Sequence, residues 1–203
     1  MKKILSIDFD CIMYPCIKLY NDKCHGDENP TIGWKKLSIE MDIDKFLSYD
    51  AQVLEDIILL VQRSVSNGAV LIPIQEHQEL VKHLDMESDE KIDLINIDFH
   101  HDIWYNRDSI SSIKLFNQYN CADWVGYLMK KDKLNSYTWY KMPNSDMFLD
   151  NMDIPFTIKK IKEIKELDEK FDTIYFCLSP QWVPYKYHHL YDLIIKLFGG
   201  KPV

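Results

Sequence analysis

The chain alternates between short apolar runs and longer stretches with helical periodicity. Five runs are short, rich in aliphatic or aromatic residues and bounded by polar or turn-forming residues, which is typical of β-strands. They cover residues 3–9, 69–74, 92–99, 136–142 and 173–178. Apolar residues recur at intervals of three and four from Val53 to Val65, and Asn67-Gly68 follows as a helix stop.

Further helices are expected between the other strands. The pattern predicts a short helix through Leu80 and Leu84 and longer helices over residues 122–131, 158–170 and 185–198, the last one closed by Gly199-Gly200. Residues 15–50 show no clear periodicity and are predicted to be irregular. Apolar strands that alternate with helices favour βαβ units. We therefore predict one domain over residues 1–203, an α/β fold of three α/β/α layers around a mainly parallel sheet.

Composition and charge narrow the function classes. The chain has 203 residues, of which 46% are hydrophobic, so it has enough apolar material for one core and does not resemble a disordered chain. Its 24 basic and 32 acidic residues give a net charge of −8, which argues against nucleic acid as the main partner. The N-terminus lacks the features of a secretory signal, and no apolar run is long enough to cross a membrane. Five dispersed cysteines then fit reduced thiols in a cytoplasmic protein.

Acids and histidines gather where three of the predicted strands end. Asp8 and Asp10 close the first strand, Glu76-His77 follow the second, and residues 98–102 (Asp-Phe-His-His-Asp) close the third. In parallel sheets ligands bind beyond the carboxyl ends of the strands. Alternate residues of an extended segment share a face, which would bring Asp98, His100 and Asp102 together. Oxygen-rich ligand sets with some imidazole suit first-row divalent metals, so we predict a metal site there.

Plainer interpretations exist for single residues. An acid directly after a strand is often the N-cap of the next helix, which on its own would explain Asp8 or Asp10. His77 could pair with Glu76 or with a backbone group. The group of Asp98, His100 and Asp102 is harder to explain without a cation, because several ionisable groups on one buried face are costly without a partner.

The stretch of residues 98–102 resembles the D-x-H-x-D motif of the arginase and ureohydrolase superfamily. His77 matches the single upstream histidine of that superfamily, and Asp8-Phe9-Asp10 matches its D-x-D pair, which lies at the N-terminus in this chain. This order, together with a late Ser-Pro-Gln-Trp at residues 179–182, is similar to a small atypical arginase-like family. Some members of that family convert arginine side chains to ornithine within ribosomally made peptides.

The resemblance implies an arginase/deacetylase-like fold and a hydrolase with two Mn²⁺ ions. Carried over by position, the six metal ligands would be Asp8, Asp10, His77, Asp98, His100 and Asp102. The metals would activate a water for attack on the guanidinium carbon of a peptide or small guanidino substrate, and urea would leave. Histone deacetylases share the superfamily but use one zinc, and the extra carboxylate of Asp102 favours two metals.

The resemblance also implies roles for residues around the metals. Asp102 would orient the attacking water and a histidine would shuttle protons. His101 is the candidate nearest in sequence, although strand alternation points it away from Asp98, and a buried structural position is an equal alternative. Glu76 and Gln181 are the candidate substrate-binding residues. The family motif has glutamate where this chain has Gln181, which would weaken arginine binding and leaves open a catalytically impaired, peptide-binding relative.

A different class of enzyme also fits the N-terminus. An apolar strand that ends in Asp8-Phe9-Asp10 is similar to the start of a haloacid-dehalogenase-like phosphatase, with Asp8 as nucleophile, Asp10 as general acid and Mg²⁺ as cofactor. Ser145-Asp146 and Asp150 resemble the later acidic motif of those enzymes. This alternative leaves the acid and histidine residues at 77 and 98–102 without a role. The oligomeric state cannot be inferred from the sequence.

Overall fold

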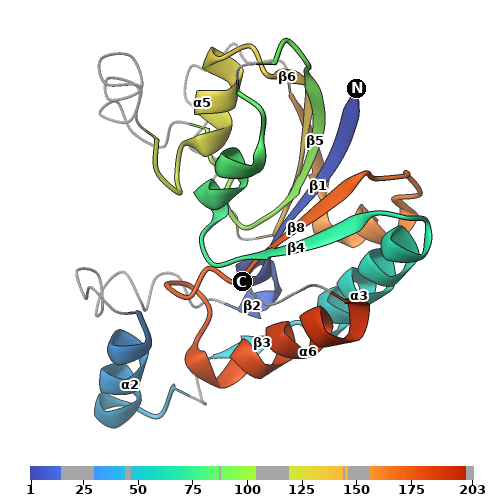
Figure 1. The fold of residues 1–203 in the computed structure, drawn as a ribbon. Helices are drawn as coiled ribbons and strands as arrows, with labels where there is room; N and C mark the ends of the chain where they lie inside the picture. Colours follow the sequence, from blue (N-terminus) through green and yellow to red (C-terminus); the bar gives the residue numbers. More distant parts are fainter. Residues whose placement is uncertain are drawn as a thin grey trace.

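The computed structural model describes residues 1–14, 30–43, 47–86, 88–103, 119–143, 145 and 156–199. Its centre is a six-stranded sheet in the order β4-β8-β1-β5-β6-β7 (Figure 1). All neighbouring strands of this sheet are parallel. Its strands are β1 (Lys2–Asp8), β4 (Val70–Ile74), β5 (Ile92–Ile97), β6 (Leu134–Lys141), β7 (Thr157–Lys160) and β8 (Thr173–Cys177).

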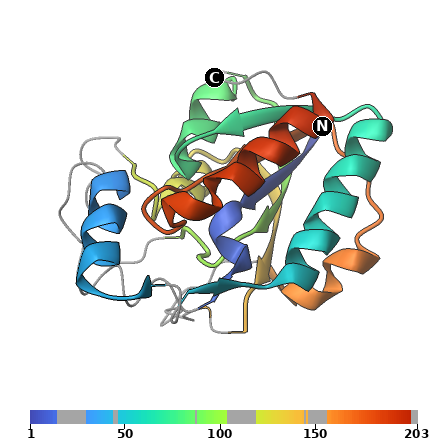
Figure 2. The same cartoon turned by 90° about the horizontal axis from the view of Figure 1, so that it is seen from below.

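Helices cover both faces of the sheet, which confirms the predicted three-layer α/β fold. One face packs against α3 (Ala51–Ser66), α6 (His188–Phe198) and the 3-10 helix η4 (Ile161–Glu166). Figure 2 looks onto this face from below, with α6 (red) and α3 (teal) in front of the sheet. The other face packs against α5 (Trp124–Lys130) and the 3-10 helix η3 (His77–His83). A small antiparallel ribbon of β2 (Met13–Tyr14) and β3 (Ser48–Tyr49) lies apart from this sheet.

The longest described helix forms where the sequence pattern predicts it. The carboxylate of Asp50 caps the start of α3 by accepting the backbone N–H groups of Gln52 and Val53 at 3.0 and 3.1 Å. Its apolar stripe is buried against the sheet. Asn67 is the C-cap residue, and Gly68 follows with a φ of 97°, a left-handed conformation that glycine adopts without strain.

Three predicted elements differ from the structure. Residues 158–170, expected as one helix, form the edge strand β7 followed by η4, because pairing with β6 and burial of Ile161 and Ile164 outweigh local helical periodicity. The helix predicted through Leu80 and Leu84 is the 3-10 helix η3. Within residues 15–50, expected to be irregular, the structure has helix α2 (Pro30–Glu40), which begins with a proline and buries Trp34 and Leu37.

The carboxyl ends of the central strands meet at one edge of the sheet. Cys177 at the end of β8 pairs with Asp8 of β1 on one side and with Ile74 of β4 on the other. On the far side of β1, Ile7 pairs with Ile97 at the end of β5. The residues that follow β4, β5 and β1 therefore emerge side by side. This geometry positions the acids and histidines singled out above.

A candidate metal centre at the strand ends

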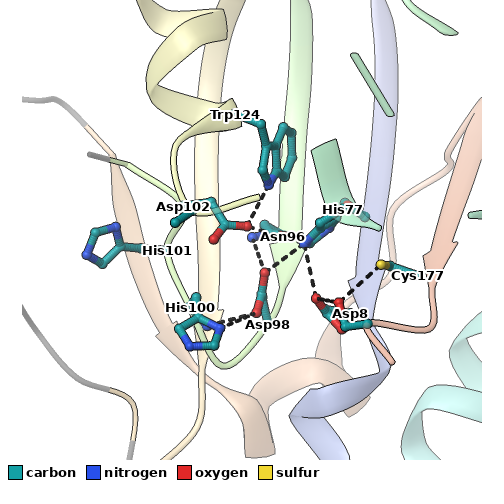
Figure 3. A network of polar contacts seen from close by, with 12 residues as sticks. Asp8, His77, Asn96, Asp98, His100, His101, Asp102, Trp124 and Cys177 are labelled. Atoms are coloured by element: carbon teal, nitrogen blue, oxygen red, sulfur yellow. Dashed lines mark hydrogen bonds and ion pairs between the residues drawn. The ribbon is translucent and has the colours of Figure 1, made fainter. Parts of the chain in front are cut away.

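The structure brings all six predicted metal ligands to this edge of the sheet (Figure 3). Asp8 is the last residue of β1, Asp98 directly follows β5, and His77 begins η3 after β4. Asp10 lies in the 3-10 helix η1 (Phe9–Ile12), for which Asp8 is the N-cap and accepts the Asp10 N–H at 3.2 Å. The capping interpretation and the ligand interpretation of Asp8 are thus compatible, because capping uses Oδ1 and leaves Oδ2 in the cluster.

Three carboxylate oxygens surround Nδ1 of His77. The distances from Nδ1 are 2.9 Å to Asp98, 3.2 Å to Asp102 and 3.4 Å to Asp8. All four side chains are buried, with 5% or less of each exposed. One ligand atom from each of His77, Asp8 and Asp98 lies within 4.8 Å of the other two. A single metal ion could therefore contact all three atoms.

A second group lies beside the first and shares Asp98 with it. His100 Nδ1 is 3.4 Å from Asp10 Oδ2 and 3.8 Å from Asp98 Oδ1. Asp10, Asp98 and His100 again offer ligand atoms within 4.8 Å of one another. Asp98 uses Oδ2 toward the first group and Oδ1 toward the second. One carboxylate placed between two ligand groups is the arrangement expected of a bridging ligand in a two-metal site.

Two buried atoms of the cluster lie at ion-pair distance from neighbours but make no hydrogen bond of good geometry within the described part of the chain. These atoms are His77 Nδ1 and Asp10 Oδ2. The other ring nitrogen of His77, Nε2, lies 2.5 Å from the Ser6 hydroxyl, which is buried. When Nε2 donates to Ser6, Nδ1 carries no proton and lies beside the carboxylates, where it can serve as a metal ligand. The residues present therefore fit divalent cations.

A second layer of donors orients the carboxylates. The Ser179 hydroxyl donates to Asp8 at 2.5 Å, and the Trp124 indole N–H donates to Asp102 at 2.5 Å. The Asn96 amide donates to Asp98 Oδ2 at 3.2 Å. Such partners hold metal ligands in one orientation.

Sequence reasoning missed these supporting residues. Ser6 and Asn96 carry a usable signal, because each is a polar residue inside a buried strand, two positions before a candidate ligand and on the same face. Trp124 comes from a distant helix and carries no such local signal.

Burial and mutual repulsion shift the pKa values of the cluster. Desolvation, reinforced by the neighbouring carboxylates, raises the pKa of Asp8, Asp10 and Asp98 above the ordinary aspartate value. Burial alone would lower the pKa of His77, but Asp102 and Asp98 outweigh it and raise that pKa well above its ordinary value. In the same way Asp10 outweighs burial and raises the pKa of His100 to about 9. A cluster that retains protons in this way can exchange them for cations.

The segment after β5 differs from the extended geometry that the sequence predicted. The strand ends at Ile97, and Asp102 adopts a left-handed backbone with a φ of 53°. The carbonyl of Asp102 accepts N–H groups of Val125 and Gly126 at the start of α5. Asp102 therefore reaches His77 through a turn that is fixed by α5, and the alternation argument was wrong in its geometry although the side chains converge.

His101 does not lie with the cluster. Figure 3 shows its ring turned away from Asp98, and it packs edge-on against Trp139 with ring centroids 5.4 Å apart. Burial lowers the pKa of His101 to about 4, and its Nδ1 accepts the backbone N–H of Ile103 at 3.0 Å. The predicted role of His101 as a proton shuttle does not agree with this position, and the structural alternative does.

A pocket opens above the cluster, with about 420 Å³ of empty space that includes open solvent at its mouth. Both candidate substrate-binding residues line it, and the Gln181 amide donates to Glu76 at 3.1 Å. Its lining also includes part of the cluster, namely Asp8, His77, His100 and Asp102, and the side chains of Cys121, Ala122, Ser179 and Trp182. The pocket thus gives a substrate access to the candidate metal ligands.

The phosphatase alternative gains little from these positions. Asp10, its general acid, is 1% exposed and does not line the pocket. Asp146 and Asp150 of its later motif lie outside the described residues.

None of the described helices combines the length and the apolar composition needed to cross a membrane. Searches of protein-family models, of curated proteins and of solved structures found no match to this chain. Inference about function therefore rests on the geometry of the site and on the motif resemblance.

Proposed function

We propose that this protein is a two-metal hydrolase that hydrolyses the guanidino group of a substrate, most specifically of an arginine side chain in a peptide. The observation that carries the proposal is the pair of ligand groups that share Asp98 beneath an open pocket. In the reaction, water adds to the guanidinium carbon and the carbon–nitrogen bond to the side chain breaks. The products are urea and a primary amine, which is ornithine when the substrate is arginine.

The residues of the two groups would hold the metals, and Mn²⁺ is the ion we propose. His77 and Asp8 would bind one ion and His100 and Asp10 the other, with Asp98 between them. The bound cations supply Lewis acidity that makes water nucleophilic near neutral pH and stabilises charge in the transition state. Carboxylate and imidazole ligands without thiolate are the donor set that manganese accepts.

Asp102 is the candidate for handling the proton of the attacking water. Its carboxylate lines the pocket, and the indole of Trp124 fixes its orientation. A carboxylate held in this way can accept a proton from water on one side and return it to the leaving nitrogen. Its position beside His77 keeps it within the same cluster.

Charge favours a cationic substrate over a phosphate ester. The four cluster carboxylates carry −4, and two divalent cations carry +4, so the loaded cluster is neutral when both histidines are neutral. Glu76 then leaves the pocket with a net charge of about −1. A guanidinium group is attracted to such a pocket, whereas a phosphate dianion is repelled.

The test is an assay of the protein purified with Mn²⁺. Metal content is measured by mass spectrometry, and N-acetyl-arginine amide and arginine-containing peptides are assayed for urea and for the loss of CH₂N₂ per arginine. Two equivalents of metal and urea release are expected, and both should be lost in Asp98→Asn. Zero or one equivalent would refute the two-metal site. Full metal content without urea would refute the hydrolase proposal and favour the binding relative, and phosphate release with Mg²⁺ would favour the phosphatase.

A further inference from the structure

We propose that Glu76 recognises the cationic head of the substrate, and that Gln181 and Gln78 are positioning residues that hold its carboxylate in place. This inference rests on the proposed guanidino hydrolase function and assigns the recognition step within the same pocket. Its basis is the pair of amide hydrogen bonds to Glu76 and the charge that remains in the pocket once cations are bound.

The Glu76 side chain lines the pocket and does not cap a helix. Glu76 occupies the N-cap position of η3, but its side chain makes no capping hydrogen bond. Its Oε1 accepts from the Gln181 amide at 3.1 Å and its Oε2 from the Gln78 amide at 2.5 Å. A glutamate that served only to cap the helix would direct its carboxylate at the backbone N–H groups of η3.

The partners of Glu76 preserve its negative charge. Gln181 and Gln78 are neutral donors, and no lysine or arginine is among the described residues that line the pocket. A basic partner would neutralise the carboxylate and occupy the fork geometry that a guanidinium needs. Each carboxylate oxygen has two acceptor sites, so one bond from each glutamine leaves capacity for two parallel N–H donors of a substrate.

The other two acidic residues that line the pocket, Asp8 and Asp102, interact with the metal-ligand cluster. Asp8 belongs to a metal-ligand group, and Asp102 contacts His77 within the cluster. Among the described residues that line the pocket, Glu76 thus lies outside both ligand groups and, unlike Asp102, forms no ion pair with His77. Trp182 lines the same pocket, and an aromatic side chain is a favourable neighbour for a planar cation. Gln181, expected to contact substrate in place of a family glutamate, acts through Glu76 in this arrangement.

The experiment compares a cation with its neutral isostere on the Mn²⁺-loaded protein. Dissociation constants of N-acetyl-arginine amide and N-acetyl-citrulline amide are measured by calorimetry, and urea release is measured on the same samples. The wild-type protein is expected to prefer the arginine compound by about tenfold or more, as loss of a charge-assisted bidentate contact implies. Glu76→Gln should abolish this preference, and Gln181→Leu should reduce it severalfold while metal content stays at the wild-type value.

Glu55→Gln is the matched control, because it makes the same charge change on the exposed side of α3, on the opposite face of the sheet. It should keep the wild-type preference. If Glu76→Gln retains the preference for the arginine compound, or if the wild-type protein has none, recognition by Glu76 is refuted. Urea release that persists in either case would leave the hydrolase proposal intact. A Glu76-dependent preference without urea release would support the recognition site and refute the hydrolase proposal.

Discussion

Replacing Asp98 with asparagine perturbs both ligand groups through one side chain. The substitution preserves the shape of the side chain but removes the charge that lies 2.9 Å from His77 Nδ1 and 3.8 Å from His100 Nδ1. Each group of three ligand residues is thereby reduced to two. We expect both metal equivalents to be lost together, because neither group retains enough anionic ligands for a divalent ion.

The size of the stabilisation that Asp98→Asn should lose follows from the linkage between metal binding and folding. A metal at 100 times its dissociation constant stabilises the folded state by about 2.7 kcal/mol per site. In a domain of this length that corresponds to a rise in Tm of roughly 5 to 11 °C per site. Without metal, the wild-type protein loses this advantage in stability over Asp98→Asn. Asp98 is fully buried beside Asp8 and Asp10, and its pKa is raised, so its charge destabilises the fold above pH 4. The metal-free variant should match or exceed the wild type in stability.

The assay is thermal unfolding with and without Mn²⁺ at pH 8, combined with metal analysis. Asp192→Asn, an exposed aspartate on α6, is the control with the same charge change. The control should show the wild-type rise in Tm, and Asp98→Asn should show almost none. A wild-type rise in Tm and two bound equivalents in Asp98→Asn would refute the bridging role.

Other substitutions and conditions separate the contributions of the site. His77→Ala and His100→Ala should each lose one metal equivalent and retain the other, and loss of both in either variant would contradict two separable groups. Ser6→Ala removes the partner of His77 Nε2 and should weaken Mn²⁺ binding about 10- to 100-fold in a metal titration. The pKa of His100 is raised to about 9 and that of His77 is raised well above its ordinary value, so protons compete with metal more strongly at pH 6 than at pH 8. The Mn²⁺-induced rise in Tm should therefore be larger at pH 8 than at pH 6, and an equal rise would contradict this linkage. Phe176→Ala, at a fully buried strand position, should cost about 3 to 5 kcal/mol in urea unfolding of the metal-loaded protein, and a cost below about 1 kcal/mol would contradict its core position.

Local pattern was enough for most of the fold. Strands with continuous apolar runs, such as those at residues 3–9 and 92–99, are recognisable because a buried parallel strand needs apolar side chains on both faces. Helix α3 is recognisable because its stripe, cap and glycine stop agree with one another. Residues 158–170 were misassigned because an edge strand, with most of its residues exposed, has no apolar alternation to distinguish it from a surface helix.

The candidate site was predictable in part for a related reason. Acids and histidines after several parallel strands converge because all those strands end at one edge, whatever their order in the sheet. The position of His101 outside the cluster and the turn at Asp102 could not be obtained from spacing alone, since they depend on contacts with Trp139 and α5. The role of Gln181 beside Glu76 likewise depends on two loops that are 105 residues apart in the chain.

The local hydrophobic pattern is sufficient to predict the layered α/β architecture and the side chains at the strand ends, because burial and strand direction are encoded in it. The tertiary structure sets how those side chains divide between the two ligand groups and the pocket. It placed Asp98 between two ligand groups, paired Ser6, Trp124 and Ser179 with individual ligands, and left Glu76 outside the cluster. The physical reason is that ligand geometry is set by distances of a few ångströms between segments far apart in the chain, and no local pattern specifies those distances.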